Sequence, residues 1–192
     1  MSYITSLTTA QVAQLSTSII AAFTSSEIRE LSAIQVAALT TAQVQSLTTS
    51  QMPVFTTTQV AALSTSAVAA LETADFDQLT TAQLAALTAT QARALTTDEL
   101  GTLSSTELGA LSAAALAGLN TASVVALTTD QMPGLTTAQV AALTTAQLVA
   151  LETADFAALG TTQLRALTAA QAAALSAAQL GALGSAQLAG LA

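Results

Sequence analysis

Apolar and polar positions recur along this chain with a strict period of eight residues. Counted from Leu7, every eighth residue up to Leu191 is Leu or, at Phe23 and Phe55, Phe, without insertion or deletion. Position six of this octad is also apolar in every copy, as at Val12. Position two is nearly always Ser or Thr, position five is mostly Gln or Glu, and position eight is mostly Ala or Gly. One eight-residue unit therefore fills the chain.

A period of eight fits neither of the regular secondary structures. The apolar residues are spaced five, three, five and three apart, so in a continuous α-helix their stripe would slip by roughly 80° per octad and soon surround the helix. In a strand, a step of five moves a side chain to the opposite face. The backbone direction must therefore be reset once in each octad.

The polar residues supply the reset. A Ser or Thr followed three residues later by Gln or Glu, as in Thr8 and Gln11, is the pattern of a capping box at the start of a helix. The Leu at position one then precedes the cap, and the apolar residue at position six packs against it as a hydrophobic staple. Each octad is predicted to be one capped helix of about six residues plus a corner.

Helices this short are marginal by themselves, because isolated helices below ~12 residues are unstable in water. The octads must therefore stack into a solenoid that buries both apolar columns. We predict an all-α solenoid of very short helices, with one capped helix per octad. The alternative is a β-solenoid with three octads per coil, which the Thr and Val content favours. Abundant Ala, Gln and Leu, all good helix formers, support the helical fold.

The whole chain, residues 1–192, is expected to be a single solenoid of 24 octads. A longer repeat is superimposed, because residues 51–84 reappear as residues 131–164, displaced by 80 residues. Each of these two segments carries a Met-Pro pair, which places Pro53 and Pro133 at position seven, inside the expected helix. Because proline removes an amide donor and clashes with the preceding turn, these two octads should end early or bend.

The composition argues against two classes of binding partner, nucleic acids and membranes. The chain is 52% hydrophobic and only 7% charged, and 3 Lys+Arg against 11 Asp+Glu give a net charge of −8. The scarcity of cations argues against binding to nucleic acid or to anionic membrane surfaces. Polar residues interrupt every apolar run, so no membrane-spanning segment is expected. The first residues, MSYITSLTTAQ, lack the basic and apolar regions of a cleavable signal peptide.

Two octads concentrate negative charge and raise the question of a metal site. Clustered carboxylates are the ligands of hard cations, and the candidates are Glu72, Asp75, Asp77, Glu152 and Asp155. The interpretation we favour is a variant cap, in which Asp at the third helical position interacts with the helix dipole. We therefore expect no metal site and no cofactor.

The chain has few residues of the types that enzymes use for catalysis. The chain contains no His and no Cys, the residues most often used for acid–base and nucleophilic chemistry. No phosphate-binding or dinucleotide-binding glycine motif occurs. We predict a protein that is not an enzyme and has no small-molecule substrate.

The unbroken octad L-[TS]-T-A-Q-[VL]-x-A resembles the Ala/Thr/Gln-rich repeat tracts of very large bacterial surface or secreted proteins, such as hemagglutinin-like, heme-utilisation/adhesion-like and RTX-type adhesins. The resemblance covers the whole chain, although the Gly-Asp nonapeptides of RTX proteins are absent. It implies a stalk or spacer at the bacterial cell surface or outside the cell, exported without a cleavable signal peptide. Open repeat ends favour self-association end to end. The alternative function is a binding module that uses one face, for example aligned Thr side chains, for a peptide, a glycan or ice.

Overall fold

The structure is a computed structural model in which residues 3–191 are described, and all of its regular secondary structure in that range is helical. The predicted all-α solenoid of short helices is confirmed, and the β-solenoid alternative is wrong. The elements are η1 (Tyr3–Ser6), α1 (Thr9–Ala13), α2 (Thr17–Ala21), α3 (Ser25–Glu30), α4 (Ala33–Ala37), α5 (Thr41–Gln45), η2 (Met52–Val54), α6 (Thr57–Ala62), α7 (Thr65–Val68), α8 (Thr73–Phe76), α9 (Thr81–Ala85), α10 (Ala89–Ala92), α11 (Thr97–Thr102), α12 (Ser105–Ala110), α13 (Ala113–Gly118), α14 (Thr121–Val125), η3 (Met132–Gly134), α15 (Thr137–Ala142), α16 (Thr145–Ala150), α17 (Thr153–Ala157), α18 (Thr161–Leu164), α19 (Ala169–Ala174), α20 (Ala177–Gly181) and α21 (Ser185–Leu188).

A capping box starts most of these helices, as the sequence predicts. At α5, the extended backbone of Thr40 places its hydroxyl where it accepts a hydrogen bond from the amide of Gln43 at 3.3 Å. The Gln43 side-chain oxygen in turn accepts from the amide of Thr40 at 2.8 Å. At the other end, the amide of Leu47 closes the last turn on the carbonyl of Val44. From Leu7 on, and outside the two octads that contain proline, each octad is thus an α-helix of four to six residues that starts after one position-one residue and ends near the next.

Positions one and six form a single hydrophobic core that runs along the molecule. Position six is fully buried in most octads, for example at Val44 and Leu148, and most position-one leucines are nearly so. The cluster of buried residues reaches from Ile4 to Leu183, and partly buried leucines such as Leu167 and Leu175 pack against it. Burial of each such side chain contributes about 1.5–3 kcal/mol, which a helix of five residues cannot gain without its neighbours.

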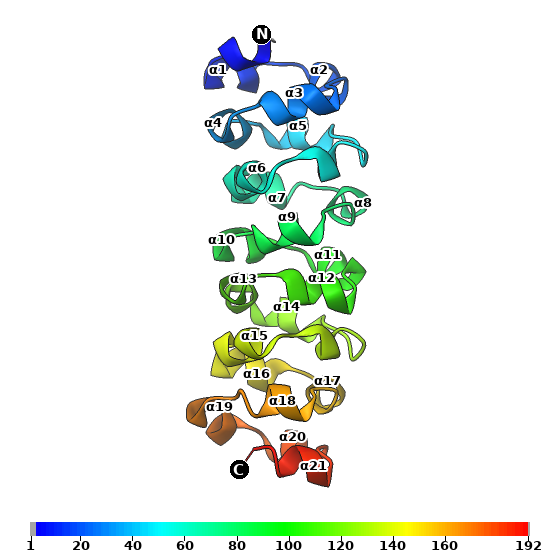
Figure 1. Ribbon diagram of the computed structural model, residues 1–192, viewed down its shortest axis with the longest axis vertical. Coiled ribbons are helices and arrows are strands. Elements are labelled where there is room, and N and C mark those ends of the chain that lie inside the picture. Colours follow the sequence, from blue (N-terminus) through cyan, green and yellow to red (C-terminus); the bar gives the residue numbers. More distant parts are fainter. Residues whose placement is uncertain (1–2, 192) are drawn as a thin grey trace.

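The helices wind into a straight rod, with the two ends of the chain at opposite ends of it (Figure 1). Helices three octads apart pack against each other along its length, for example α1 with α4 and α10 with α13. In Figure 1, α1, α4 and α6 follow one another down one edge, and below them the same edge continues with α10, which lies four octads after α6. One coil therefore takes slightly more than three octads.

The long repeat in the sequence matches this geometry. At about ten octads for three coils, a segment of 80 residues returns to the same side of the rod. The helices α8 and α17, whose octads are 80 residues apart, accordingly lie on the same edge in Figure 1. The repeated block is three complete coils.

The two proline octads depart from the helical pattern as predicted. Both form a short 3-10 turn instead of an α-helix, namely η2 after Gln51 and η3 after Gln131, and neither has a side-chain hydrogen bond at its N-cap. The Met at position six stays fully buried in both. The core thus continues through the irregular octads.

In the part of the chain that the structure describes, every helix is too short to span a bilayer.

Candidate functional site: a column of buried glutamines

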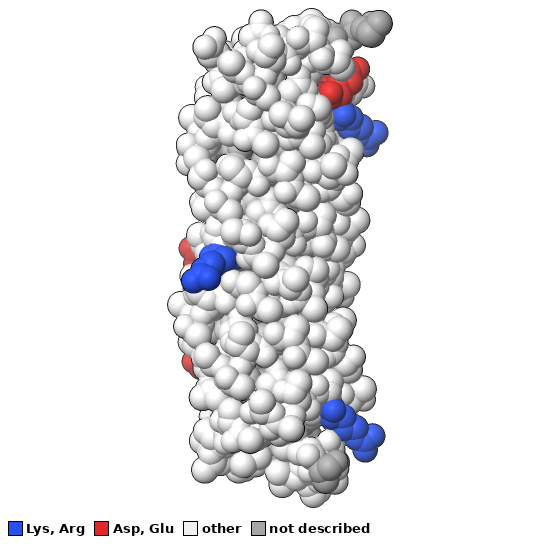
Figure 2. Space-filling model, turned by 90° about the vertical axis from the view of Figure 1, so that its left-hand side faces the viewer, with Lys and Arg blue, Asp and Glu red and all other residues white. Residues whose placement is uncertain are grey.

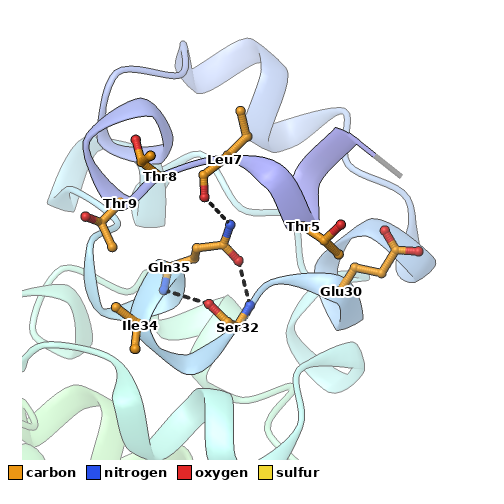
Figure 3. A pocket seen from close by; sticks show the side chains of 8 residues that line it. All are labelled: Thr5, Leu7, Thr8, Thr9, Glu30, Ser32, Ile34 and Gln35. Atoms are coloured by element: carbon orange, nitrogen blue, oxygen red, sulfur yellow. Dashed lines mark hydrogen bonds between the residues drawn. The ribbon is translucent and has the colours of Figure 1, made fainter. Parts of the chain in front are cut away.

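The glutamines at position five form a column inside the rod, which we call the glutamine column. In each buried glutamine the side-chain oxygen accepts from the amide at position two of the same octad, while the amide nitrogen reaches the neighbouring coil. The Nε2 atom of Gln43 donates to the carbonyl oxygens of Val12 and Leu15, both at 2.8 Å. Figure 3 shows the same arrangement at Gln35, whose side chain lies between the carbonyl of Leu7 and the amide of Ser32.

The pattern repeats along the chain with the same sequence separation. The acceptors lie 31 and 28 residues before the glutamine, at position six of one octad and position one of the next. The buried members of the column are Gln35, Gln43, Gln51, Gln59, Gln83, Gln91, Gln131, Gln139, Gln147, Gln163, Gln171 and Gln179.

The column donates to two kinds of backbone carbonyl. The position-six carbonyl, as at Val12, already accepts from the amide of the next leucine, whereas the position-one carbonyl, as at Leu15, accepts from no backbone amide. The last carbonyls of any helix lack partners within it, and here they face the interior between two coils. An unpaired buried carbonyl costs about 1–3 kcal/mol. A glutamine that gives the position-one carbonyl its partner, and the position-six carbonyl a second one, therefore fastens one coil to the next as well as starting its own helix.

Sequence reasoning assigned only the first of these roles. The signal for the second is the preference for Gln over Glu at position five. A glutamate oxygen would serve the cap equally well, and its charge would interact favourably with the helix dipole. Only the amide, however, carries the N–H groups that the carbonyls of the neighbouring coil require.

Several octads have no amide at position five. Glu27 lies in the first coil, where the hydrogen bonds from the backbone and hydroxyl of Thr24 lower the pKa of its exposed carboxyl group. Glu99 is almost fully buried, and burial raises its pKa. The remaining exceptions in the interior of the column are Ala67, Asp75, Glu107, Ala115, Ser123 and Asp155.

The metal-site candidates Glu72, Asp75 and Asp77 belong to the octad of α8. Asp75 is buried at position five, whereas Glu72 at the N-cap and Asp77 at the C-cap are exposed. Burial raises the pKa of Asp75, and the negative charge of Glu72 adds to that effect. Asp75 lies in the first turn of α8, as the variant-cap interpretation requires, but the Glu72 side chain makes no cap hydrogen bond.

The second acidic octad is arranged in the same way. Asp155 is buried in the first turn of α17, and Glu152 is an exposed N-cap without a side-chain hydrogen bond. Burial raises the pKa of Asp155, a hydrogen bond from Thr129 lowers it, and Glu152 raises it. Within residues 3–191, no three His, Cys, Asp or Glu side chains come together as a set of metal ligands.

The outer surface carries few charged side chains, and many of its hydroxyl groups are engaged in hydrogen bonds within the rod. The hydroxyls of position two are engaged by the caps, as at Thr40 and Thr136, and position three points to solvent. Figure 2 shows cations separated from one another along a face that is otherwise nearly uncharged. A hollow of about 380 Å³ lies near the N-terminal end and is lined by Thr5, Leu7, Thr8, Thr9, Glu30, Ser32, Ile34 and Gln35 (Figure 3).

The fold and the glutamine column together define the class of protein, an all-α solenoid built from one short capped helix per octad. The chain belongs to the ALTTAQ repeat family, which it matches over residues 20–49, 34–65, 68–105, 103–137, 148–185 and 159–192. These matches cover most of the rod. A search of curated proteins finds no match to the chain.

Proposed function

We propose that this repeat protein is a structural rod that sets the distance between the parts of a larger assembly and is not an enzyme. The observation that carries the proposal is that two of the three repeated polar columns, the cap hydroxyls and the glutamine column, form hydrogen bonds within the rod, which leaves the position-three column on the surface. Buried glutamines such as Gln83 and Gln139 have both ends of the amide bonded to the chain itself. A repetitive structure of this kind adds length in regular steps.

We propose further that the rod is the stalk or spacer of a large bacterial surface or secreted adhesin. The Ala/Thr/Gln-rich octads that fill residues 7–191 support this setting by their resemblance to the repeat tracts of such proteins. The low content of charged side chains, 7%, suits a spacer that does not compete with a binding domain for ligands.

We also propose that isolated rods stack end to end. Gln11 in the first coil is exposed, and within the described chain no carbonyl accepts from its Nε2 atom. At the other end, Leu180 and Leu188 are 38% and 44% exposed at position six, which is buried in most other octads. Inside the rod the same donor position meets position-six and position-one carbonyls of the preceding coil. In a head-to-tail contact the last coil of a second rod supplies such carbonyls to Gln11 and buries its exposed leucines, and this contact does not close on itself.

The experiment that tests the spacer role separates length from surface chemistry. One variant of the native protein lacks residues 51–130, which removes three coils and preserves the register. A matched variant keeps the length but replaces exposed position-three threonines such as Thr41, Thr81 and Thr137 with serine. A spacer predicts that adhesion changes in the shortened variant and is unchanged in the surface variant. The reverse result would contradict the proposal and favour a binding face.

A further inference from the structure

Glu99 interrupts the glutamine column at a place where the interior is closed. It stands at position five of α11 and is 1% exposed. Its Oε2 atom takes the role of the glutamine oxygen, because it accepts from the amide of Thr96 at 2.7 Å and from the Thr96 hydroxyl at 2.8 Å. Its Oε1 atom is buried and is without a hydrogen-bond partner.

The 80-residue repeat supplies the comparison that shows what Oε1 faces. The counterpart of Glu99 in the second block is Gln179, whose Nε2 atom donates to the carbonyls of Leu148 and Leu151. The same register in the first block places the carbonyls of Val68 and Leu71 opposite Oε1 of Glu99. Where Gln179 presents an N–H donor, ionised Glu99 presents a negative oxygen to two carbonyl oxygens.

We propose that Glu99 is a proton-controlled latch between two coils. With a proton on Oε1, the carboxyl group donates to the carbonyl of Val68 or Leu71 and replaces the amide of a glutamine. Without the proton, Oε1 has no donor to offer and the junction between α11 and α8 is weakened. The pH then sets how firmly these two coils are joined near the middle of the rod.

The surroundings of Glu99 favour the protonated form. Burial raises the pKa of Glu99 above its usual range, and the negative charge of Asp98 raises it further, against the hydrogen bonds from Thr96. The charged groups of α8 and its caps, which pack on α11 from one side, are Glu72, Asp75 and Asp77, all acidic. The helix α14, on the other side, carries no titratable side chain. No cation therefore lies on the helices packed against Glu99.

The sign of the pH dependence follows. An acid whose pKa is raised on folding contributes stability that is complete below the pKa of the unfolded chain and is lost as the pH rises through the pKa of the folded chain. The hydrogen bond from Glu99 to the neighbouring coil is therefore formed in acid and is lost toward higher pH. Glutamine cannot titrate, so Glu99→Gln should hold the junction closed at every pH.

The test compares melting temperatures of the full chain and three variants between about pH 4 and pH 9. We expect Glu99→Gln to melt higher than the native chain at the upper end, with a difference that shrinks toward zero in acid. Gln179→Glu should introduce the opposite change at the counterpart site, a loss at high pH that acid restores. The control is Glu107→Gln. Glu107 is also at position five but is only half-buried, so this substitution should give a smaller pH-dependent difference in melting temperature. A gap between Glu99→Gln and the native chain that is equal at all pH values would overturn the proposal.

Infrared spectroscopy gives a second readout that does not depend on stability. The native chain should retain the carbonyl stretch of protonated carboxylic acid at a pH at which exposed glutamates are ionised. Glu99→Gln should reduce this band by the contribution of one carboxyl group, while the buried Asp75 and Asp155 are unchanged in both chains. An equal band in the two chains would overturn the proposal. Absence of the band from the native chain would overturn the proposal. Replacing sodium by a bulky organic cation at constant ionic strength should leave the native melting temperature unchanged, and a drop seen in the native chain but not in Glu99→Gln would assign a metal cation in place of the proton.

Discussion

The side-chain amide of Gln43 donates to the carbonyl oxygen of Val12 at 2.8 Å, although 31 residues separate the two. The same side chain holds the N-cap of its own helix through the amide of Thr40. One residue type therefore links the local signal that starts a helix to the long-range contact that joins two coils. This double use explains how helices of only four to six residues can be stable in a rod.

Replacement of a buried glutamine should be costly. Gln43→Ala removes the donors to Val12 and Leu15 and the acceptor for Thr40, and leaves buried polar groups unpaired. We expect a loss of about 2–4 kcal/mol in the free energy of unfolding, measured by chemical denaturation. The control is Gln11→Ala, at an exposed glutamine of the first coil, which should cost about 1 kcal/mol or less. Equal losses in both variants would show that the contacts between coils contribute nothing.

The cap hydroxyls should contribute separately from their neighbours. Thr136 accepts a hydrogen bond from the amide of Gln139 at 3.2 Å, whereas Thr137 is exposed at position three. Thr136→Ala is expected to destabilise the chain by about 1 kcal/mol, and Thr136→Ser by much less. Thr137→Ala should have almost no effect or a slightly stabilising one, because alanine is the better helix former. Thermal denaturation followed by circular dichroism distinguishes these outcomes, and identical effects at the two positions would contradict the capping argument.

Two glycines within helices should respond to substitution by alanine in opposite directions. A Cβ added at Gly118 would overlap the carbonyl oxygen of Ala89, because α13 packs tightly on α10, whereas a Cβ at Gly101 in α11 would meet nothing. Gly118→Ala should therefore destabilise the rod by about 1–3 kcal/mol through overpacking. Gly101→Ala should stabilise it by roughly 0.5–1 kcal/mol, because alanine has the higher helix propensity. Equilibrium unfolding of both variants checks the difference in sign.

The hydrophobic core formed by positions one and six should contribute most of the stability of the rod. Leu148 at position six is fully buried, and the adjacent Val149 is 44% exposed. Leu148→Ala is expected to cost about 2–5 kcal/mol, as other buried Leu→Ala changes do, and Val149→Ala less than about 0.5 kcal/mol. Similar losses at the two sites, measured in denaturant, would be incompatible with a core limited to positions one and six.

Much of this fold could be predicted from the sequence because its signals are local. The spacing of Leu7, Val12 and Leu15 excludes one long helix, and the pair Thr8 and Gln11 identifies the start of a short one. Proline at position seven predicted the irregular turns η2 and η3. These conclusions depend on residues within one octad, where short-range sterics and hydrogen bonds decide the conformation.

The size of the coil and the second role of glutamine could not be predicted in the same way. Both depend on which octads face each other after the chain has wound once, and no single octad contains that information. The contact between Gln35 and Leu7 spans 28 residues, which is neither three nor four whole octads. The Glu99 site was overlooked for the same reason, since its missing donor matters only opposite the carbonyls of the neighbouring coil.

The central claim is that the side chains of the glutamine column bridge consecutive coils. The most direct measurement is an NMR experiment on the chain with isotope-labelled glutamine, recording contacts and hydrogen exchange of the side-chain amides. The account predicts contacts from the Nε2 protons of Gln43 to protons of Val12 and Leu15, and slow exchange for Gln43, Gln59 and Gln83 but not for the exposed Gln11. Fast exchange of all glutamine side chains, without contacts to residues 28–31 positions earlier, would contradict it.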